Sequence, residues 1–226
     1  SRAEARWVNP SHKPNLMRLL LFALCPLLVA QAAEKPFTML TDELLAKLPE
    51  ARRAEWTAYL AQSRAFAETE HRILDVERTK AEAKPAPGKR AEFEHDSDTP
   101  AEWFGSAENQ KVAEIVISYQ TPTGGWSKAV DYTKGPRQPG THWTSQTGDA
   151  WHYCGTFDNR TTTEQIKFLA GVFTATKRDD VKAALMKGLD YVFAAQYPNG
   201  GWPQNYPVER GYQMVRDYAK NIIHKL

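Results

Sequence analysis

Asp158 is the residue of this sequence best suited to bind a metal ion. It precedes Asn159 in a turn that follows Gly155, just ahead of a stretch with helical periodicity. A carboxylate, an amide carbonyl and nearby backbone oxygens are the hard ligands that Ca²⁺ selects. The same residue types are also common in turns that satisfy backbone amides and favour the start of a helix. The residues alone therefore leave both a calcium ligand and a plain turn open for Asp158.

Lys128 is the second candidate for chemistry. It follows Trp126 and Ser127 directly after a glycine pair, so its ammonium could hold a carboxylate as a point charge beside an aromatic platform. A loop lysine that is simply solvated is the alternative. His142 and His152 lack His-x-x-x-His spacing, so a zinc site has little support. The sequence also has no G-x-S-x-G elbow and no phosphate-binding loop.

An internal repeat flanks these residues. Both Gln120–Trp126 and Gln196–Trp202 read Q-x-P-x-G-G-W, and each closes a segment with helical periodicity. Proline disfavours helix at the residue before it, and the glycine pair permits a tight turn. Neither unit can bury its apolar stripe alone, so units of this size are expected to stack or close into a ring. We therefore expect an all-α fold made of helical hairpins of a partial α/α toroid, with long loops containing glycine and tryptophan. An elongated helical solenoid is the alternative.

Several stretches have the residue spacing of helices, and no alternating pattern of useful length predicts a strand. Thr41 and Ser106 are placed to cap two of the helices, and Thr161-x-x-Glu164 reads as a capping box that opens a third. The charged segment 50–80 is expected to form one or two surface helices with a bend near Ser63. The predicted apolar faces of the later helices are Val112, Ile115, Val116 and Tyr119; Ile166, Leu169, Ala170 and Phe173; and Val181, Leu185, Leu189, Val192 and Phe193.

Composition divides the chain into five parts. Met17 begins a short positive start and an apolar run too short to span a bilayer, and Ala30-x-Ala32 follows as a cleavage site. These features predict a secreted protein, extracellular or periplasmic, without a stable membrane anchor. The expected parts are 1–16, a doubtful leader; 17–33, a signal peptide; 34–80, an N-terminal helical segment; 81–100, a proline-containing linker; and 101–226, the main domain.

Charge and cysteine usage exclude some classes of function. The formal net charge is +2 with both signs mixed, and no basic face is interleaved with aromatics, so no nucleic-acid partner is expected. Cys25 and Cys154 do not make a disulfide framework, and Cys154 is expected to be a buried thiol. Seven Trp and nine Tyr are compatible with stacking against carbohydrate, although most aromatic side chains fill cores.

The motifs resemble those of the family 10 polysaccharide lyases, the pectate lyases. The resemblance spans roughly Ala101 to Gly211. It rests on Gly124–Lys128, on Thr156–Asn159 with Thr161, Thr162 and Gln165, and on the run from Gly188 to Pro207. It implies an α/α toroid that cleaves polygalacturonate, the backbone of pectin, by β-elimination. A base removes the proton at C5 of a galacturonate and the glycosidic oxygen leaves from C4, while Ca²⁺ and cationic side chains stabilise the developing anion.

Carried over residue by residue, the resemblance gives four positions a role. Asp158 would be a Ca²⁺ ligand near the scissile bond, and Lys128 would bind a substrate carboxylate. Asn159 and Trp126 would be further substrate contacts. The protein is expected to act as a monomer on polygalacturonate.

The catalytic base has no counterpart in this sequence. The family uses an arginine in the second half of its module, whereas the tail from Arg210 to Leu226 does not resemble the family's continuation. The base is therefore unassigned, and neither Arg210 nor Arg216 takes its place. Domain 101–226 is accordingly expected to be a truncated pectate lyase-like domain, incomplete or inactive as given.

Two other functions remain open. A non-catalytic carbohydrate-binding or scaffold fragment is the first, because the expected truncation of the domain favours it. A terpene-cyclase-like toroid is the second, because those proteins also repeat Gln with Gly-x-Trp. The second is disfavoured by the lack of an Asp-rich initiation motif and by the secretion signal.

Overall fold

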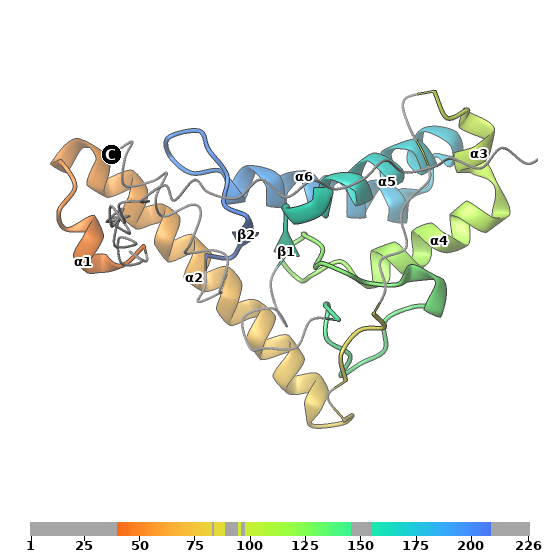
Figure 1. Cartoon of the computed structure of the whole chain (residues 1–226), viewed down its shortest axis with the longest axis horizontal. Helices are drawn as coiled ribbons and strands as arrows, with labels where there is room; N and C mark the ends of the chain where they lie inside the picture. Colours follow the sequence, from red (N-terminus) through yellow and green to blue (C-terminus); the bar gives the residue numbers. More distant parts are fainter. Residues whose placement is uncertain (1–39, 83, 89–94, 96–97, 146–154, 209–226) are drawn as a thin grey trace, which may run out of the picture. The chain divides into compact units, whose positions relative to one another are not determined.

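The computed structural model of the chain is mostly helical, which confirms the all-α class (Figure 1). The toroid and the five-part division of the chain stay predictions. The expectations for the leader, the signal peptide, His152, Cys154 and the tail after Gly211 lie outside the described residues. In the part of the chain that is described, no helix is both long and apolar enough to cross a membrane. The described residues are 40–82, 84–88, 95, 98–145 and 155–208, all within the unit Pro36–Leu226.

The N-terminal helices begin where the caps predict. Helix α1, Asp42–Leu45, starts after Thr41, whose side chain accepts a hydrogen bond from the Leu44 amide at 3.3 Å. Helix α2, Glu50–Arg78, is one continuous helix, so the expected bend at Ser63 is absent. It is a surface helix, as predicted, with one buried face and most of its other residues exposed. The buried residues of α2 are Trp56, Tyr59, Leu60, Ser63, Ala67, Glu70 and Leu74.

Helix α2 packs on residues from the other end of the described chain. Tyr59 donates a hydrogen bond from its hydroxyl to the Ala195 carbonyl at 3.1 Å. Burial raises the pKa of Tyr59 above its usual range, so this phenol stays protonated as a donor. The cluster joining the two ends comprises Leu45, Leu48, Trp56, Tyr59, Leu60, Tyr191, Ala195, Tyr197 and Tyr206.

The segment predicted as a linker contacts the main domain. Ala86 is only 3 % exposed and belongs to the core cluster described next. Lys84 forms a parallel bridge with Thr141, and Gly88 forms an antiparallel bridge with Val130. Residues 84–88 thus run beside the long loop that follows Trp126.

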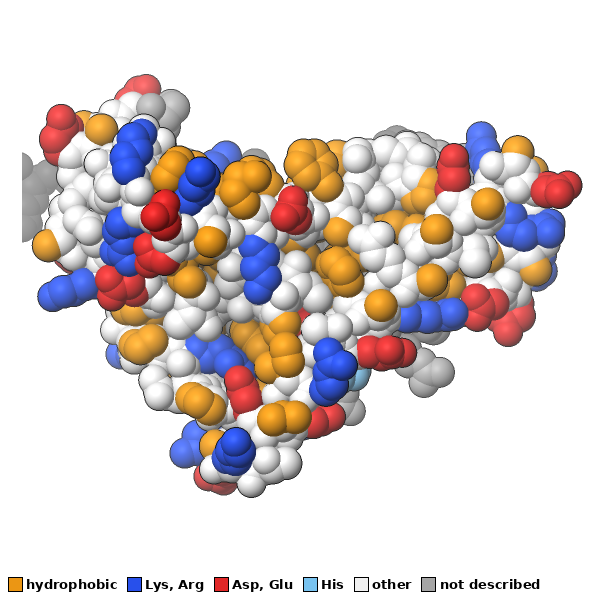
Figure 2. All heavy atoms as spheres, turned by 180° about the vertical axis from the view of Figure 1, so that it is seen from behind, with side chains coloured by type: hydrophobic (Ala, Val, Ile, Leu, Met, Phe, Trp, Pro, Cys, Tyr) orange, Lys and Arg blue, Asp and Glu red, His pale blue; other side chains and the backbone are white. Residues whose placement is uncertain are grey.

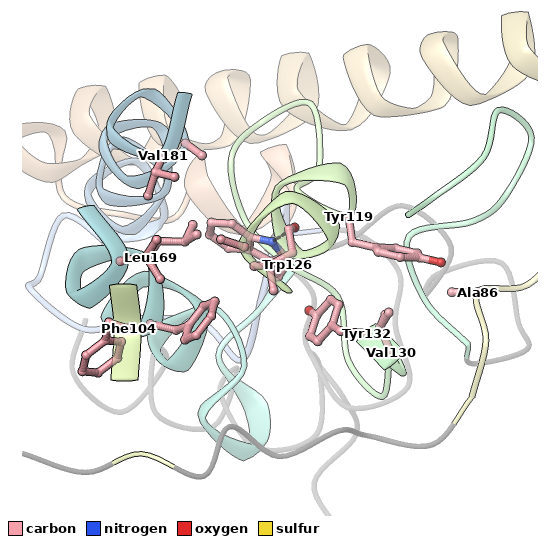
Figure 3. Close-up of a cluster of buried hydrophobic side chains, with 13 residues drawn as sticks. Ala86, Phe104, Tyr119, Trp126, Val130, Tyr132, Leu169 and Val181 are labelled. Carbon is pink, nitrogen blue, oxygen red and sulfur yellow. Dashed lines mark hydrogen bonds between the residues drawn. The ribbon is translucent and has the colours of Figure 1, made fainter. Parts of the chain in front are cut away.

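Four helices build the main core. Helix α3 is Ala101–Gly105, and helix α4, Ala107–Ser118, starts after Ser106, whose hydroxyl accepts from the Asn109 amide at 3.2 Å. Helices α5, Thr163–Thr176, and α6, Asp179–Ala195, are joined through Lys177 and Arg178 as a hairpin (Figure 1). Helix α5 packs against α3, α4 and α6. Their core cluster comprises Ala86, Phe104, Ala113, Val116, Tyr119, Trp126, Val130, Tyr132, Phe168, Leu169, Val172, Val181 and Ala184 (Figure 3).

The buried faces of α5 and α6 differ from the predicted ones. Helix α5 buries Gln165, Phe168, Leu169 and Val172. Helix α6 buries Val181, Ala184, Gly188, Tyr191 and Ala195. Phe193, predicted to be on the buried face, is 70 % exposed. Small residues therefore occupy contact positions that a count of large apolar residues overlooks.

The two Q-x-P-x-G-G-W phrases fold alike; we name Gln120–Trp126 the first glycine turn and Gln196–Trp202 the second. In each, the Gln side chain donates to the first glycine's carbonyl, at 2.8 Å and 3.1 Å respectively. Each indole N–H donates at 2.8 Å to a carbonyl ten residues earlier, on Val116 and Val192. The internal repeat is therefore structural as well as sequential. Only the surroundings differ, since Trp126 is 0 % exposed and Trp202 is 40 % exposed.

Short elements connect the helices. Strand β1, Gly155–Thr156, pairs antiparallel with β2, Asn205–Tyr206, with Gly155 opposite Tyr206. The 3-10 turns η1 and η3 are Tyr132–Lys134 and Asp158–Arg160. The sequence predicted no strand, because a two-residue pair is too short to show an alternating pattern. On the face drawn in Figure 2, acidic and basic side chains are intermixed, so that face carries no field of a single sign.

Candidate functional site

Lys128 and Asp158, thirty positions apart, meet as an ion pair. The Lys128 ammonium donates to an Asp158 carboxylate oxygen. The two side chains are 20 % and 23 % exposed, so the pair is reachable from solvent and partly screened from it. The structure thus joins two residues that were predicted to have separate roles.

Tyr191 of α6 lies beneath both segments that carry the pair. A Cβ on Gly125 would lie 2.5 Å from the Tyr191 ring carbon Cζ, and one on Gly155 would lie 2.5 Å from its hydroxyl oxygen. Distances this short are forbidden, so glycine at both positions lets the two segments rest on the ring. Tyr191 is 0 % exposed, and its hydroxyl donates to the Tyr206 carbonyl at 2.6 Å.

Trp126 is a core residue, which corrects the expectation of a substrate-stacking platform. Figure 3 shows its indole among core side chains contributed by several helices. A Cβ on Gly188 would lie 3.0 Å from the indole, so the small residue on α6 makes room for the ring. Both faces of the indole are therefore covered. The contribution of Trp126 is to anchor the backbone that leads to Lys128.

Hydrogen bonds fix the backbone around Asp158. The Thr156 amide donates to the Trp126 carbonyl at 2.9 Å, which links the two halves of the site. The Asp158 amide donates to the Thr156 hydroxyl at 3.1 Å, and that hydroxyl donates to the Gln204 carbonyl at 2.9 Å. Asn159 is exposed, with φ 51° and ψ 38° in the left-handed region that asparagine tolerates. The side chain of Asn159 is therefore open to a ligand beside the ion pair.

The predicted capping box does not form. Helix α5 begins at Thr163, its N-cap is Thr162, and the N-cap side chain makes no capping hydrogen bond. Glu164 instead pairs with Arg160 across 3.0 Å. Arg160 is 72 % exposed at its side chain, so this pair contributes little to stability.

Calcium fits the donor chemistry of this site only in part. Ca²⁺ takes about six to eight oxygen ligands. Asp158 and Asn159 offer a carboxylate and an amide oxygen, but the carboxylate already contacts an ammonium. Within the described ranges, no three or more His, Cys, Asp or Glu side chains gather as a metal cluster. A bound ion would therefore need most of its ligands from the substrate, water or other residues.

The loop after Lys128 is anchored to the end of α2 by contacts that the sequence did not reveal. Arg137 donates two hydrogen bonds to Glu77, at 3.1 Å and 2.6 Å, and lies 4.2 Å from the Trp143 ring centroid. Burial alone would raise the pKa of Glu77. The hydrogen bonds from Arg137 and the Gly140 amide, with the Arg137 charge, outweigh burial and hold that pKa below its usual value. No spacing signal marks a pair sixty positions apart.

His142 is part of the same anchor. Its Nε2 lies 2.9 Å from an Arg78 guanidinium nitrogen, and the residue is only 6 % exposed. Since arginine can only donate, Nε2 accepts in this contact. His142 therefore helps to hold the loop against the end of α2.

Comparison with known proteins identifies the segment that carries the site. Residues 120–225 match the family described as Pectic acid lyase. No curated protein matches the chain. A mutant of a family 10 polysaccharide lyase from Cellvibrio cellulosa, in complex with trigalacturonic acid, is 29 % identical with a TM-score of 0.38. That match covers 50 % of this chain and 34 % of the other.

A second solved structure, a family 10 polysaccharide lyase from the same organism, is 27 % identical with a TM-score of 0.39. It covers 60 % of this chain and 39 % of the other, so the chain spans only about a third to two fifths of either structure's length. Both glycine turns, Lys128 and Asp158 lie inside the segment that matches the family. The match to the pectic acid lyase family therefore confirms the resemblance to pectate lyases for residues 120–225 of this chain.

Proposed function

We propose that this chain is part of a pectate lyase that cleaves polygalacturonate by β-elimination with the help of Ca²⁺. The observation that carries the proposal is the Lys128–Asp158 ion pair inside the segment that matches the pectic acid lyase family. A partly exposed ammonium suits an anionic sugar polymer, which presents one carboxylate on every residue. The mutant lyase from Cellvibrio cellulosa was solved in complex with trigalacturonic acid, which is likewise an anionic sugar chain.

In this reaction Lys128 would have to stabilise negative charge on the substrate carboxylate. Removing the C5 proton leaves charge on the adjacent carboxylate group, so a fixed cation at that group lowers the barrier more than it strengthens substrate binding. In the free protein, Asp158 holds the ammonium in a defined place. A galacturonate carboxylate would take over the ammonium from Asp158. Lys128 therefore acts as a binding and charge-stabilising group, and the proton acceptor remains unassigned.

Asp158 gains a second role once the substrate has displaced it. Its carboxylate, with the exposed amide oxygen of Asn159, would then be available to Ca²⁺. When bound, the ion would supply further neutralisation of the substrate carboxylate. Because the described residues of the site offer few ligands for Ca²⁺, we propose that calcium binds together with the polymer and only weakly without it. The polymer lies outside the cytoplasm, so the proposal includes action there, as a monomer, after removal of residues 17–33.

The test is a direct assay of elimination. Purified chain is incubated with polygalacturonate and Ca²⁺, and the ultraviolet absorbance of the C4–C5 double bond is followed. The proposal predicts a rise that stops when a chelator is added and resumes with excess Ca²⁺, and no rise with a neutral glucan. Folded protein that binds polygalacturonate but yields no absorbance would remove the catalytic claim.

That last outcome would favour a second candidate function, binding of pectin without cleavage. The observation in its favour is the exposure of two aromatic side chains, Phe193 at 70 % and Trp202 at 40 %. Exposed aromatic rings offer apolar faces to sugars. Replacing Trp202 by Ala would weaken retention on immobilised polygalacturonate if binding alone is the function, and would leave it unchanged otherwise.

A further inference from the structure

The Thr162 hydroxyl forms two hydrogen bonds with the backbone of Trp126. The Trp126 amide donates to Thr162 Oγ1 at 3.0 Å, and that hydroxyl lies 3.2 Å from the Trp126 carbonyl, to which it donates. The Thr156 amide donates to the same carbonyl at 2.9 Å. Thr162 is 0 % exposed, so water does not compete for these bonds. The Thr162 side chain thus forms hydrogen bonds with both the backbone N–H and the backbone C=O of a residue thirty-six positions away.

The backbone at Thr162 is strained. Its φ of 68° and ψ of −50° are a conformation that a β-branched residue rarely adopts. Arg160 and Asn159 also have positive φ, at 61° and 51°, as does Ala129 beside Lys128, at 62°. Positive φ angles therefore flank both members of the ion pair. Such strain persists only where the surrounding structure over-determines it, and it concentrates at functional sites.

An ordinary helix cap does not explain this arrangement. A capping threonine accepts a hydrogen bond from an amide in the first turn of its own helix. Thr162 occupies the N-cap of α5 but makes no such bond. Its hydroxyl is directed at the segment that carries Lys128, while its backbone continues from the turn that carries Asp158.

We propose that Thr162 is a positioning residue whose hydroxyl bonds both the backbone N–H and the backbone C=O of Trp126 and thereby holds Lys128 against Asp158. We call this pair of hydrogen bonds the clasp. Lys128 follows Trp126 by two residues, and Asp158 precedes Thr162 by four. The clasp sets the spacing between ammonium and carboxylate at the point where the substrate carboxylate would enter. Its importance for catalysis rests on the proposed function, whereas its effect on the ion pair does not.

Three substitutions separate the clasp from simple packing. Thr162→Val keeps the shape and removes the hydroxyl, while Thr162→Ser keeps the hydroxyl. Thr163→Val is the matched control, because the Thr163 hydroxyl is exposed and bonds only the neighbouring Arg160 carbonyl, at 2.8 Å. Near-ultraviolet circular dichroism of each variant establishes that tertiary packing is retained.

The first readout does not depend on activity. Acetic anhydride at limiting concentration acylates lysines, and mass spectrometry of peptides gives the rate at Lys128. We expect Thr162→Val to raise that rate about fivefold, the factor that corresponds to one hydrogen bond of ordinary net strength. Thr162→Ser and Thr163→Val should match the parent chain. Equal rates in a folded Thr162→Val variant and the parent would overturn the proposal.

Thr162→Gly covers the case in which the valine variant does not fold. It relieves the backbone strain and also removes the hydroxyl, so the rate at Lys128 should rise in the same way; a rate equal to that of the parent would again overturn the clasp.

The second readout is steady-state kinetics on polygalacturonate. Thr162→Val should raise KM and lower kcat, with recovery of both in Thr162→Ser. A changed acylation rate with no elimination by the parent chain would leave the clasp intact and remove the proposed function. Elimination by the parent with an unchanged acylation rate in Thr162→Val would leave the proposed function intact and overturn the clasp.

Discussion

Replacing Gly125 by Ala tests how the first glycine turn is seated on α6. The added Cβ would lie 2.5 Å from Tyr191 Cζ and 2.8 Å from both adjoining ring carbons, whereas ordinary contact begins near 3.4 Å. The ring would therefore have to move by about 0.9 Å. It cannot do so freely, because it is fully buried and its hydroxyl bonds the Tyr206 carbonyl.

Overpacking of this kind costs about 1–3 kcal/mol, and we expect the upper end because a buried hydrogen bond is strained as well. The melting temperature should fall by roughly 6–12 °C. Gly201→Ala is the matched control, since it occupies the same place in the second glycine turn but its nearest contacts would be at 3.6 Å. We expect a change within about 0.5 kcal/mol there.

Urea and thermal unfolding followed by far-ultraviolet circular dichroism would measure both variants. If Gly125→Ala and Gly201→Ala had the same stability within about 0.5 kcal/mol, the first glycine turn would not be packed on Tyr191 as described, and the support proposed for the site would be refuted.

Three further outcomes follow from the same contacts. Trp126→Ala should cost about 3–5 kcal/mol in the free energy of unfolding, and Trp202→Ala clearly less, because only the former is fully buried; chemical denaturation compares them, and equal losses would contradict the difference. Glu77→Gln should lower stability by about 2 kcal/mol at neutral pH because the bonds from Arg137 lose their charge. Since the folded pKa of Glu77 is lowered, its stabilisation is complete above the ordinary value of 4.5 and is lost as pH falls below it. Melting temperatures from pH 7 to pH 3 should therefore converge for Glu77→Gln and the parent, and parallel curves would exclude the linkage. Calcium should raise the melting temperature appreciably only when a galacturonate oligomer is present; equal stabilisation by calcium alone would contradict joint binding.

Helix positions and turns were predictable because their signals are local. Thr41 and Ser106 precede their helices as N-caps, and both hydroxyls make the expected bonds. The repeated glycine turns were readable because proline and paired glycines restrict the backbone within a few residues. The buried face of α6 was not, because Ala184 and Gly188 are contact positions through their small size. Hydrophobicity patterns give weight to large residues and miss such close approaches.

The residues of the site could be predicted from the sequence, but their arrangement in space could not. Lys128 and Asp158 stood out by their neighbours, yet their pairing depends on how two distant segments lie on α6. Trp126 was ambiguous, since the same sequence is buried in one turn and half-exposed in the other. The capping box failed because the helix starts one residue later than predicted: the N-cap is Thr162, whose hydroxyl bonds the Trp126 backbone, and Glu164 pairs with Arg160 four residues earlier.

The central claim is that Lys128 and Asp158 form the substrate site of a pectate lyase. The most direct measurement is the rate of unsaturated product formation from polygalacturonate by Lys128→Ala and Asp158→Ala, with Lys134→Ala as an exposed lysine control on the same loop. We expect each site variant to lose at least about a hundredfold in kcat/KM, in line with the loss of one charge-stabilising group, while the control keeps the parent rate. Equal rates in all four proteins would contradict the claim.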